Sequence, residues 1–246
     1  MTQQQSSGRS PLRVIVIGIV VVALIGVAAV AALLIAGGSG EASQAITAPT
    51  LAASTAGETT VFSIVPEESE VRFSLGEDLR GERVTVVGTT DQVAGQLEVD
   101  FATPANSEIG VIRINVRTLR TDNEFRDRAI RGFVLQSAED RFEFAQFMPN
   151  TLTGMPESVT LGEPFTFQIT GDLQLREIMQ PVTFDVTVTP ISETRIEGTA
   201  SATVTRAQYE LTIPNAPGVA NVSEEVLLEI DFVAVAGAAE TTPEAS

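Results

Sequence analysis

Apolar and polar residues alternate one by one along most of the chain between residues 59 and 236. Residues 165–176 read FTFQITGDLQLR, in which nearly every second residue is apolar or glycine. Successive side chains of a β-strand point to opposite faces, so each such stretch has one apolar face and one polar face. The same pattern recurs at residues 71–75, 93–101, 112–117, 182–188, 196–204 and 226–233.

A single apolar face is typical of antiparallel sheets, because parallel sheets are usually buried on both faces. About eight such strands, joined mostly by short polar connections, predict a mainly β fold. An extended eight-stranded antiparallel barrel satisfies the pattern, since closure removes both sheet edges. A sandwich of two sheets fits the alternation nearly as well.

One segment interrupts the alternation. Residues 122–135 read DNEFRDRAIRGFVL, and Asp122 can cap a helix that begins there. The sequence therefore predicts a short helix across one end of the barrel. Its apolar side chains near one face are Phe125, Ala129, Ile130 and Phe133.

The N-terminal part of the chain lacks this alternation and contains a long apolar segment. Residues 14–36 contain no charged or strongly polar side chain, and about 20 such residues span a bilayer as a helix. Arg9 and Arg13 precede this segment, and the next basic residue is Arg72. The positive-inside rule then predicts a cytoplasmic N-terminus at residues 1–13 and a single-pass transmembrane helix at 14–36, either an anchor or an uncleaved signal. A cleaved signal, which the run of small residues from Ala36 leaves open, is the less favoured alternative.

The remaining boundaries follow from composition. Residues 37–58 are mostly Gly, Ser, Ala and Thr and predict a flexible linker. Residues 59–236 form the predicted β-domain, which this orientation places outside the cytoplasm. Residues 237–246 resemble the linker and predict a disordered tail.

The inward face of the predicted barrel is apolar, and none of its alternating positions is charged. Inward small residues, such as Gly95, Gly171 and Gly198, predict unfilled volume inside. An apolar ligand would contact the larger inward residues and the neighbouring alanines. Alternation by itself favours an ordinary packed core, because every half-buried sheet shows it. The candidate ligand-binding residues are Val71, Phe73, Leu97, Val99, Ile112, Ile114, Phe165, Phe167, Phe184, Val186, Ala200, Ala202, Leu228 and Ile230.

Composition argues against several functions. The chain has no Cys, His or Trp, and all 15 basic residues are Arg. The usual soft-metal ligands, a thiol nucleophile and a Schiff-base lysine are therefore missing. The formal net charge is −17, and since Arg9 and Arg13 are the only charged residues among the first 40, the rest carries −19. Such a surface repels phosphates, so we expect no nucleic-acid partner.

No recognisable catalytic arrangement remains. The sequence lacks a nucleophile elbow, a P-loop and a dinucleotide-binding glycine motif. We expect the chain not to be an enzyme, to need no cofactor and to hold no metal. Helix capping explains the acids at 122, 124 and 127 more simply than a cation site does. Arg126, Arg128 and Arg131 are interpreted as helical ion pairs with these acids, in preference to a contact with an anion or headgroup.

From Phe62 to about Ala236 the chain resembles the YceI-like, lipid- or polyisoprenoid-binding family. The resemblance rests on an ordered set of short motifs. They are FSIVP with ESEVRF at 62–73, VAGQL at 93–97, TDN with RD and IR at 121–131, GDLQL at 171–175, QPVTF at 180–184, and the arginine segment at 206–211.

This resemblance implies a lipocalin-like barrel with an apolar pocket, an isoprenoid-type ligand and an extracytoplasmic bacterial setting. Glu68, the turn at Arg176 and Glu177, and Glu210 depart from the family pattern, which bears on headgroup contacts. The first hypothesis is a lipid carrier or storage module. The alternative is a membrane-tethered interaction domain with a packed barrel and no ligand. The oligomeric state stays open.

Overall fold

The structure is a computed structural model that describes residues 40–51 and 59–237. The predicted cytoplasmic N-terminus, the transmembrane helix at 14–36 and nearly all of the predicted tail lie outside the described residues. Within the described ranges, no helix combines the length and the hydropathy that crossing a bilayer requires.

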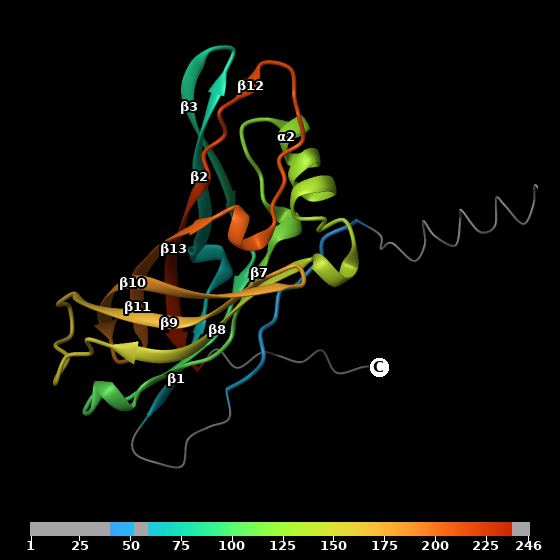
Figure 1. The fold of residues 1–246 in the computed structure, drawn as a ribbon. Coiled ribbons are helices and arrows are strands. Elements are labelled where there is room, and N and C mark those ends of the chain that lie inside the picture. Colours follow the sequence, from blue (N-terminus) through green and yellow to red (C-terminus); the bar gives the residue numbers. More distant parts are fainter. Residues whose placement is uncertain (1–39, 52–58, 238–246) are drawn as a thin grey trace, which may run out of the picture. The chain divides into compact units, whose positions relative to one another are not determined.

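The described residues form one strongly curled antiparallel sheet (Figure 1). The prediction of a mainly β, antiparallel fold is thereby confirmed, and the two separate sheets of a sandwich are not observed among these residues. Turns and breaks divide the sheet into more strands than the eight expected. They are β1 (Thr60–Ile64), β2 (Glu70–Leu79), β3 (Glu82–Thr90), β4 (Val93–Ala94), β5 (Gln96–Val99), β6 (Glu108–Ile109), β7 (Ile112–Asn115), β8 (Phe144–Thr153), β9 (Phe165–Leu175), β10 (Ile178–Ser192), β11 (Arg195–Thr205), β12 (Val219–Ala220) and β13 (Glu225–Ala236).

The order of hydrogen-bonded strands explains the curl. It runs β4-β7-β8-β9-β10-β11-β13-β1-β5-β6, and the hairpin of β2 and β3 branches from β13. Only Gly95 separates β4 from β5, so the path comes back to the stretch of chain where it began. One apolar face of the sheet is therefore turned inward along most of the path.

Strand β13 changes partners partway along one edge. Residues 227–231 pair with β2, whereas residues 234–236 pair with β1. Between these two registers the backbone N–H of Val233 donates to the Ser69 hydroxyl at 3.1 Å, and that hydroxyl donates to the Val65 carbonyl at 2.8 Å. The buried Ser69 side chain thus satisfies the donor that the change of partner would leave without a bond.

Helix α2 (Glu124–Ala129) continues as a π-helical turn, η4 (Ile130–Val134), where a short helix was predicted. The cap is Asn123, whose side chain accepts from the backbone N–H groups of Phe125 and Arg126. Asp122 was the predicted cap, but its carboxylate pairs with Arg126 instead. The remaining short helices are η1 (Pro66–Glu68), η2 (Pro104–Asn106), η3 (Val116–Thr118), η5 (Asp140–Phe142) and η6 (Ala207–Tyr209).

Residues 40–51 belong to the predicted linker and contain no helix or strand, yet they make specific hydrogen bonds with the β-domain. The Ser43 backbone N–H and hydroxyl donate to the two Glu143 carboxylate oxygens at 2.6 and 3.0 Å. Leu51 N–H donates to the Gln96 side-chain oxygen at 2.9 Å. We call residues 40–51 the N-terminal strap.

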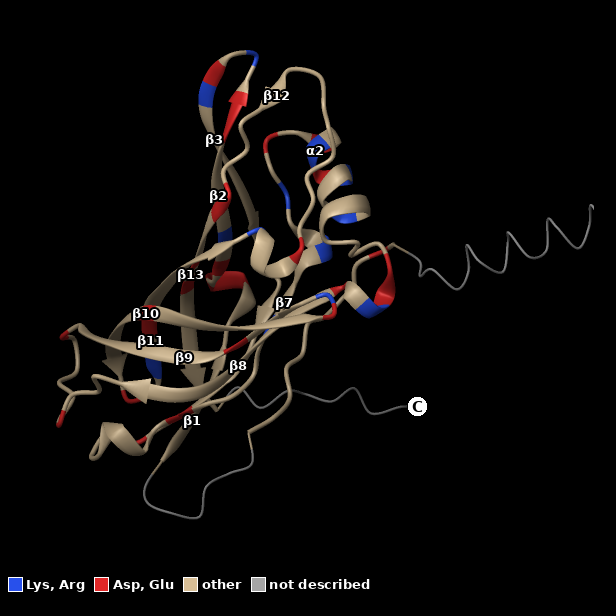
Figure 2. Ribbon diagram, in the orientation of Figure 1, with Lys and Arg blue, Asp and Glu red and all other residues tan. Residues whose placement is uncertain are grey.

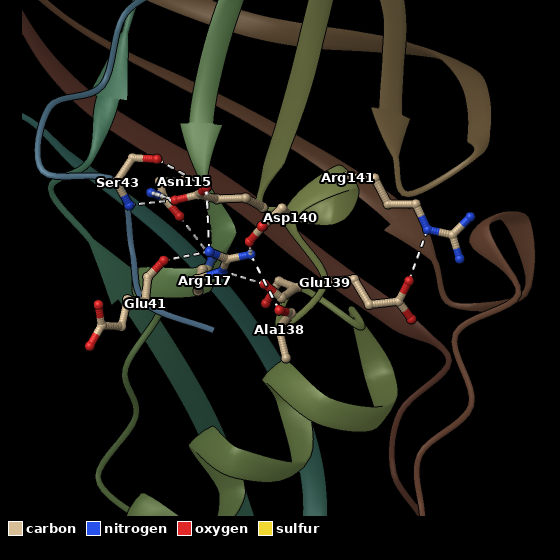
Figure 3. Close-up of polar contacts among 10 residues, drawn as sticks. Glu41, Ser43, Asn115, Arg117, Ala138, Glu139, Asp140 and Arg141 are labelled. Carbon is tan, nitrogen blue, oxygen red and sulfur yellow. Dashed lines mark hydrogen bonds and ion pairs between the residues drawn. The ribbon is translucent and has the colours of Figure 1, made fainter. Parts of the chain in front are cut away.

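The strap forms hydrogen bonds with a buried polar cluster of the β-domain (Figure 3). Arg117 is 2% exposed, and its guanidinium donates to the carbonyls of Glu41 and Ser137 and to the Asp140 carboxylate. Glu143, also buried, lies 3.5 Å from that guanidinium and accepts from the Asn115 amide at 2.7 Å. Buried charges are tolerated in proteins when they are paired and hydrogen-bonded in this way.

We predict that Glu143→Ala lowers the free energy of unfolding by about 3 kcal/mol, because it leaves Arg117 and Asn115 buried without that partner. Chemical denaturation of the full chain measures the loss. The control is Glu139→Ala, which removes only an exposed pair with Arg141 and should cost less than about 1 kcal/mol. Equal losses for the two variants would show that the cluster does not stabilise the fold.

Candidate functional site

The inner face of the sheet borders a cavity of about 740 Å³. Its lining is overwhelmingly apolar and comes from the long strands, from α2 and η4, and from the loop at residues 211–222. Pockets of roughly 300–1,000 Å³ are typical of small-molecule sites in proteins. The site is therefore large enough for an apolar ligand and offers it few hydrogen-bonding partners.

Most of the candidate ligand-binding residues surround this cavity. Eleven of the fourteen line it: Val71, Phe73, Leu97, Ile112, Ile114, Phe167, Phe184, Val186, Ala200, Leu228 and Ile230. They come from strands far apart in the sequence, and the alternation alone places them on one face.

The other three candidates lie elsewhere. Val99 and Phe165 line a second, smaller cavity of about 50 Å³. Ala202 is buried in the main hydrophobic core and borders neither cavity. The two cavities adjoin, because both are lined by Leu97, Ile109, Phe167 and Val188.

The inward glycines do not create the open volume in the way the sequence suggested. Phe232 and Gly198 are direct cross-strand partners, and a Cβ on Gly198 would come within 2.6 Å of the Phe232 ring. Phe73 covers Gly88 in the same way, at 2.2 Å. Aromatic residues commonly shield a glycine on the neighbouring strand. The glycines therefore let the rings lie against the wall, and the open space lies beyond them.

The cavity reaches the surface beside α2. Lining residues that are exposed to solvent mark this mouth, namely Leu79, Arg80, Asn123, Phe125, Phe133, Asn215, Ala216 and Pro217. In Figure 1 they belong to the tip of the β2–β3 hairpin, to α2 with η4, and to the loop that carries β12. The mouth is thus built from connections and a helix, and the interior from strands.

A partly buried ion pair lies at the mouth. Glu77 of β2 is 6% exposed, and its carboxylate lies 2.9 Å from the Arg126 guanidinium of α2. Both residues line the cavity, and neither belongs to the alternating stretches from which an uncharged inner face was predicted. Arg126 also contacts Asp122, and Arg128 lies 3.5 Å from Glu124, which confirms the predicted helical pairing for these two arginines.

The acids of the predicted helix are occupied by protein partners. Asp127 accepts hydrogen bonds from the Thr121 backbone and hydroxyl, and Asp122 and Glu124 pair with arginines. Among the residues that the structure describes, no cluster of three or more acidic side chains is arranged to hold a metal ion.

Arg206 fixes the loop that forms one wall of the mouth. Its guanidinium donates to the Ser223 carbonyl at 2.8 Å and the Leu211 carbonyl at 3.5 Å, at the two ends of the loop. It also pairs with Glu224 at 3.0 Å. The loop itself was missed by sequence reasoning, because residues 211–222 contain three prolines or glycines between positions 214 and 218 and show no alternation.

Tyr209 is buried beside this loop, in the main core. It is 0% exposed, and its hydroxyl has no hydrogen-bond partner among the described residues. Burial penalises the tyrosinate and raises the pKa of Tyr209 to about 12.

A strongly curled antiparallel β-sheet with an apolar inner face defines a barrel-like class of domain. The family model of the YceI-like domain matches residues 62–234. The chain therefore belongs to the YceI-like family, as its short motifs suggested. No curated protein matches the chain.

Solved structures share the fold. A polyisoprenoid-binding domain from Saccharophagus degradans, implicated in plant cell wall breakdown, is 16% identical and superposes with a TM-score of 0.57, covering 72% of this chain and 99% of that one. BcnA from Burkholderia cenocepacia is also 16% identical, with a TM-score of 0.54 and coverage of 69% and 98%.

We predict that stability falls between about pH 10 and pH 12 through Tyr209. Because its pKa is raised on folding, the unfolded chain releases this proton first, so the contribution is complete below pH 10 and is lost above it. The loss approaches about 2–3 kcal/mol. Tyr209 is the only tyrosine and the chain has no tryptophan, so tyrosinate absorbance reports it directly.

Tyr209→Phe is the control for this titration and should remove the pH dependence assigned to Tyr209. A native tyrosinate titration centred near pH 10, the ordinary tyrosine value, would contradict the assignment.

Proposed function

We propose that this protein binds one apolar, isoprenoid-type lipid in the cavity, as a carrier or storage module outside the cytoplasm. The observation that carries the proposal is the cavity itself, about 740 Å³ in volume and lined almost entirely by hydrocarbon and aromatic side chains. A hydrocarbon chain gains about 0.8 kcal/mol for each methylene removed from water. Several buried isoprene units would therefore give tight binding without a specific polar contact.

The two ends of the cavity suit the two ends of such a lipid. The interior offers rings and branched chains, including the edge-to-face pair of Phe147 and Phe184 with centroids 4.9 Å apart. The mouth offers polar groups at Asn123 and Arg126. A lipid would place its apolar chain inside and its polar end at the mouth. The polyisoprenoid-binding domain from Saccharophagus degradans supports this assignment through its shared fold.

The proposed location rests on the sequence. Residues 14–36 are uncharged and follow two arginines, which supports a single-pass membrane anchor with the β-domain on the extracytoplasmic side. A tethered binding domain could collect an apolar molecule from the membrane that holds it.

The alternative of a packed interaction domain is less favoured, because a packed barrel would have no continuous internal space of this size. A binding role is also favoured over catalysis. Two charged side chains at the mouth, Glu77 and Arg126, are paired with each other rather than arranged around a reacting group.

Native mass spectrometry of the full chain, extracted under mild conditions, tests the proposal. We expect one apolar adduct for each protein molecule. Protein that carries no adduct and takes up no added polyprenol would overturn the proposed function.

We predict that Ala200→Phe lowers the bound lipid at least about tenfold, because Ala200 lines the cavity and the added ring fills space that the chain would occupy. Thr199→Phe is the matched control, since the neighbouring Thr199 is exposed on the other face of β11. The measurement is the adduct fraction of each variant. Equal loss in both variants would indicate that the cavity is not the binding site.

We further predict that Phe167 limits the length of the bound chain. Its ring lines both cavities, so Phe167→Ala should join them and shift the adducts to longer chains. The control is Phe62→Ala. Phe62 is fully buried but lines neither cavity, so this variant should lose stability without a change in chain length. An unchanged length distribution for Phe167→Ala would contradict this role.

A further inference from the structure

The mouth of the cavity carries two exposed aromatic side chains. Phe125 of α2 is 78% exposed and Phe133 of η4 is 69% exposed, more than the other large apolar residues that the structure describes as exposed. Both also line the cavity mouth, together with Ala129 and Ile130 between them. Large apolar side chains that remain in water at a binding site indicate a surface that another apolar phase covers.

We propose that this surface, formed by Phe125, Ala129, Ile130 and Phe133 and called here the docking face, rests in the headgroup region of a lipid bilayer. The inference rests on the proposed function, because it gives an apolar ligand a route from the membrane into the cavity. Two observations besides exposure favour a bilayer as the partner that covers the docking face.

The first observation is the charge around the docking face. Residues 122–135 contain three arginines and three acids, so this segment is neutral while residues 41–246 carry a net charge of −19. Figure 2 shows basic and acidic residues together along α2. Most of the remaining surface is repelled by a negatively charged membrane, and the docking face is not. Arg128, 5.1 Å from the centre of the Phe125 ring, is placed to meet lipid phosphates beside it.

The second observation is where the strap meets the domain. The carbonyl of Glu41 accepts from Arg117, and Arg117 donates to the Ser137 carbonyl. The next residue, Ala138, donates its backbone N–H to the Arg131 carbonyl of η4 at 3.3 Å. Arg117 therefore links the strap to the segment that follows the docking face.

The chain length then restricts where a membrane can lie. Glu41 is five residues after Ala36, the last residue of the uncharged segment, and five extended residues reach at most about 18 Å. If residues 14–36 span a bilayer, this limits how far Glu41 can lie from the end of that span. Under the proposal, this short connection keeps the strap close to the bilayer that the docking face would contact.

Site-specific fluorescence tests the contact, because the natural chain has no cysteine. Gly132→Cys places a label between Phe125 and Phe133, at an exposed site with open space around it. Ser158→Cys, exposed in the loop between β8 and β9, is the control label. The full chain is reconstituted in phosphatidylcholine vesicles, and nitroxide-labelled phosphatidylcholine is the quencher.

We expect strong quenching of the label at residue 132 and little at residue 158. Phe125→Ser with Phe133→Ser should reduce the quenching at 132 by about threefold or more, because each serine removes an apolar ring from the lipid. Leu161→Ser with Ile191→Ser, which replaces exposed apolar residues that line neither cavity, should leave it unchanged.

Equal, weak quenching at both labelled sites would overturn the docking face. So would a disulfide-linked dimer of Gly132→Cys without quenching, which would show that a second copy covers the face. In either case a lipid adduct in native mass spectrometry would leave the proposed function intact. Quenching of the label on a protein that carries no adduct would instead support the docking face and overturn the proposed function, because the domain would contact the membrane without binding lipid in its cavity.

Discussion

The change of partner along β13 organises the rest of the structure. One edge of this strand pairs with β11 from residue 225 to 235, while its other edge is shared between β2 and β1. A buried serine, Ser69, satisfies the backbone donor of Val233 between the two pairings. An unsatisfied donor there would cost about 1–3 kcal/mol, so a side chain that reaches it is a requirement of this arrangement.

The cavity follows from this division of the sheet. Beyond its pairing with β13, β1 pairs with β5, so the sheet turns back on itself there. Strand β2 instead continues past β13 into the hairpin with β3, and its Glu77 contacts Arg126 of α2. The hairpin, α2 and the loop fixed by Arg206 extend the apolar walls beyond the curled part (Figure 1). Phe73 and Phe232 pack onto glycines of neighbouring strands, which keeps their rings along the wall. An apolar space of this kind can take a ligand without reorganising the core.

The inner wall could be predicted from the sequence because it depends on a local rule. Once the alternation fixes which residues face inward, residues such as Phe184, Ala200 and Ile230 must share one face. Ala202 shares that alternation and is buried in the main core, yet it borders neither cavity, so facing inward did not mean lining the cavity. Whether a cavity remains inside the sheet depends on how aromatic rings pack against glycines of neighbouring strands. The sequence of a single strand does not contain that information.

The mouth and the strap could not be predicted for a related reason. Glu77 reads as an ordinary surface acid in its strand, and only the position of α2 brings Arg126 against it. Ser43 lies in a run of small residues typical of a linker, yet its partner Glu143 is 100 residues away. Contacts of this range are set by tertiary structure, and charge or composition in a short window does not reveal them.

The central claim is that the cavity holds an apolar chain, and a crystal structure of the full protein, purified without added lipid, tests it most directly. We expect continuous electron density along the cavity, in contact with Phe73, Phe184 and Phe167. Side chains collapsed into the cavity, or a cavity filled with ordered water, would contradict the claim.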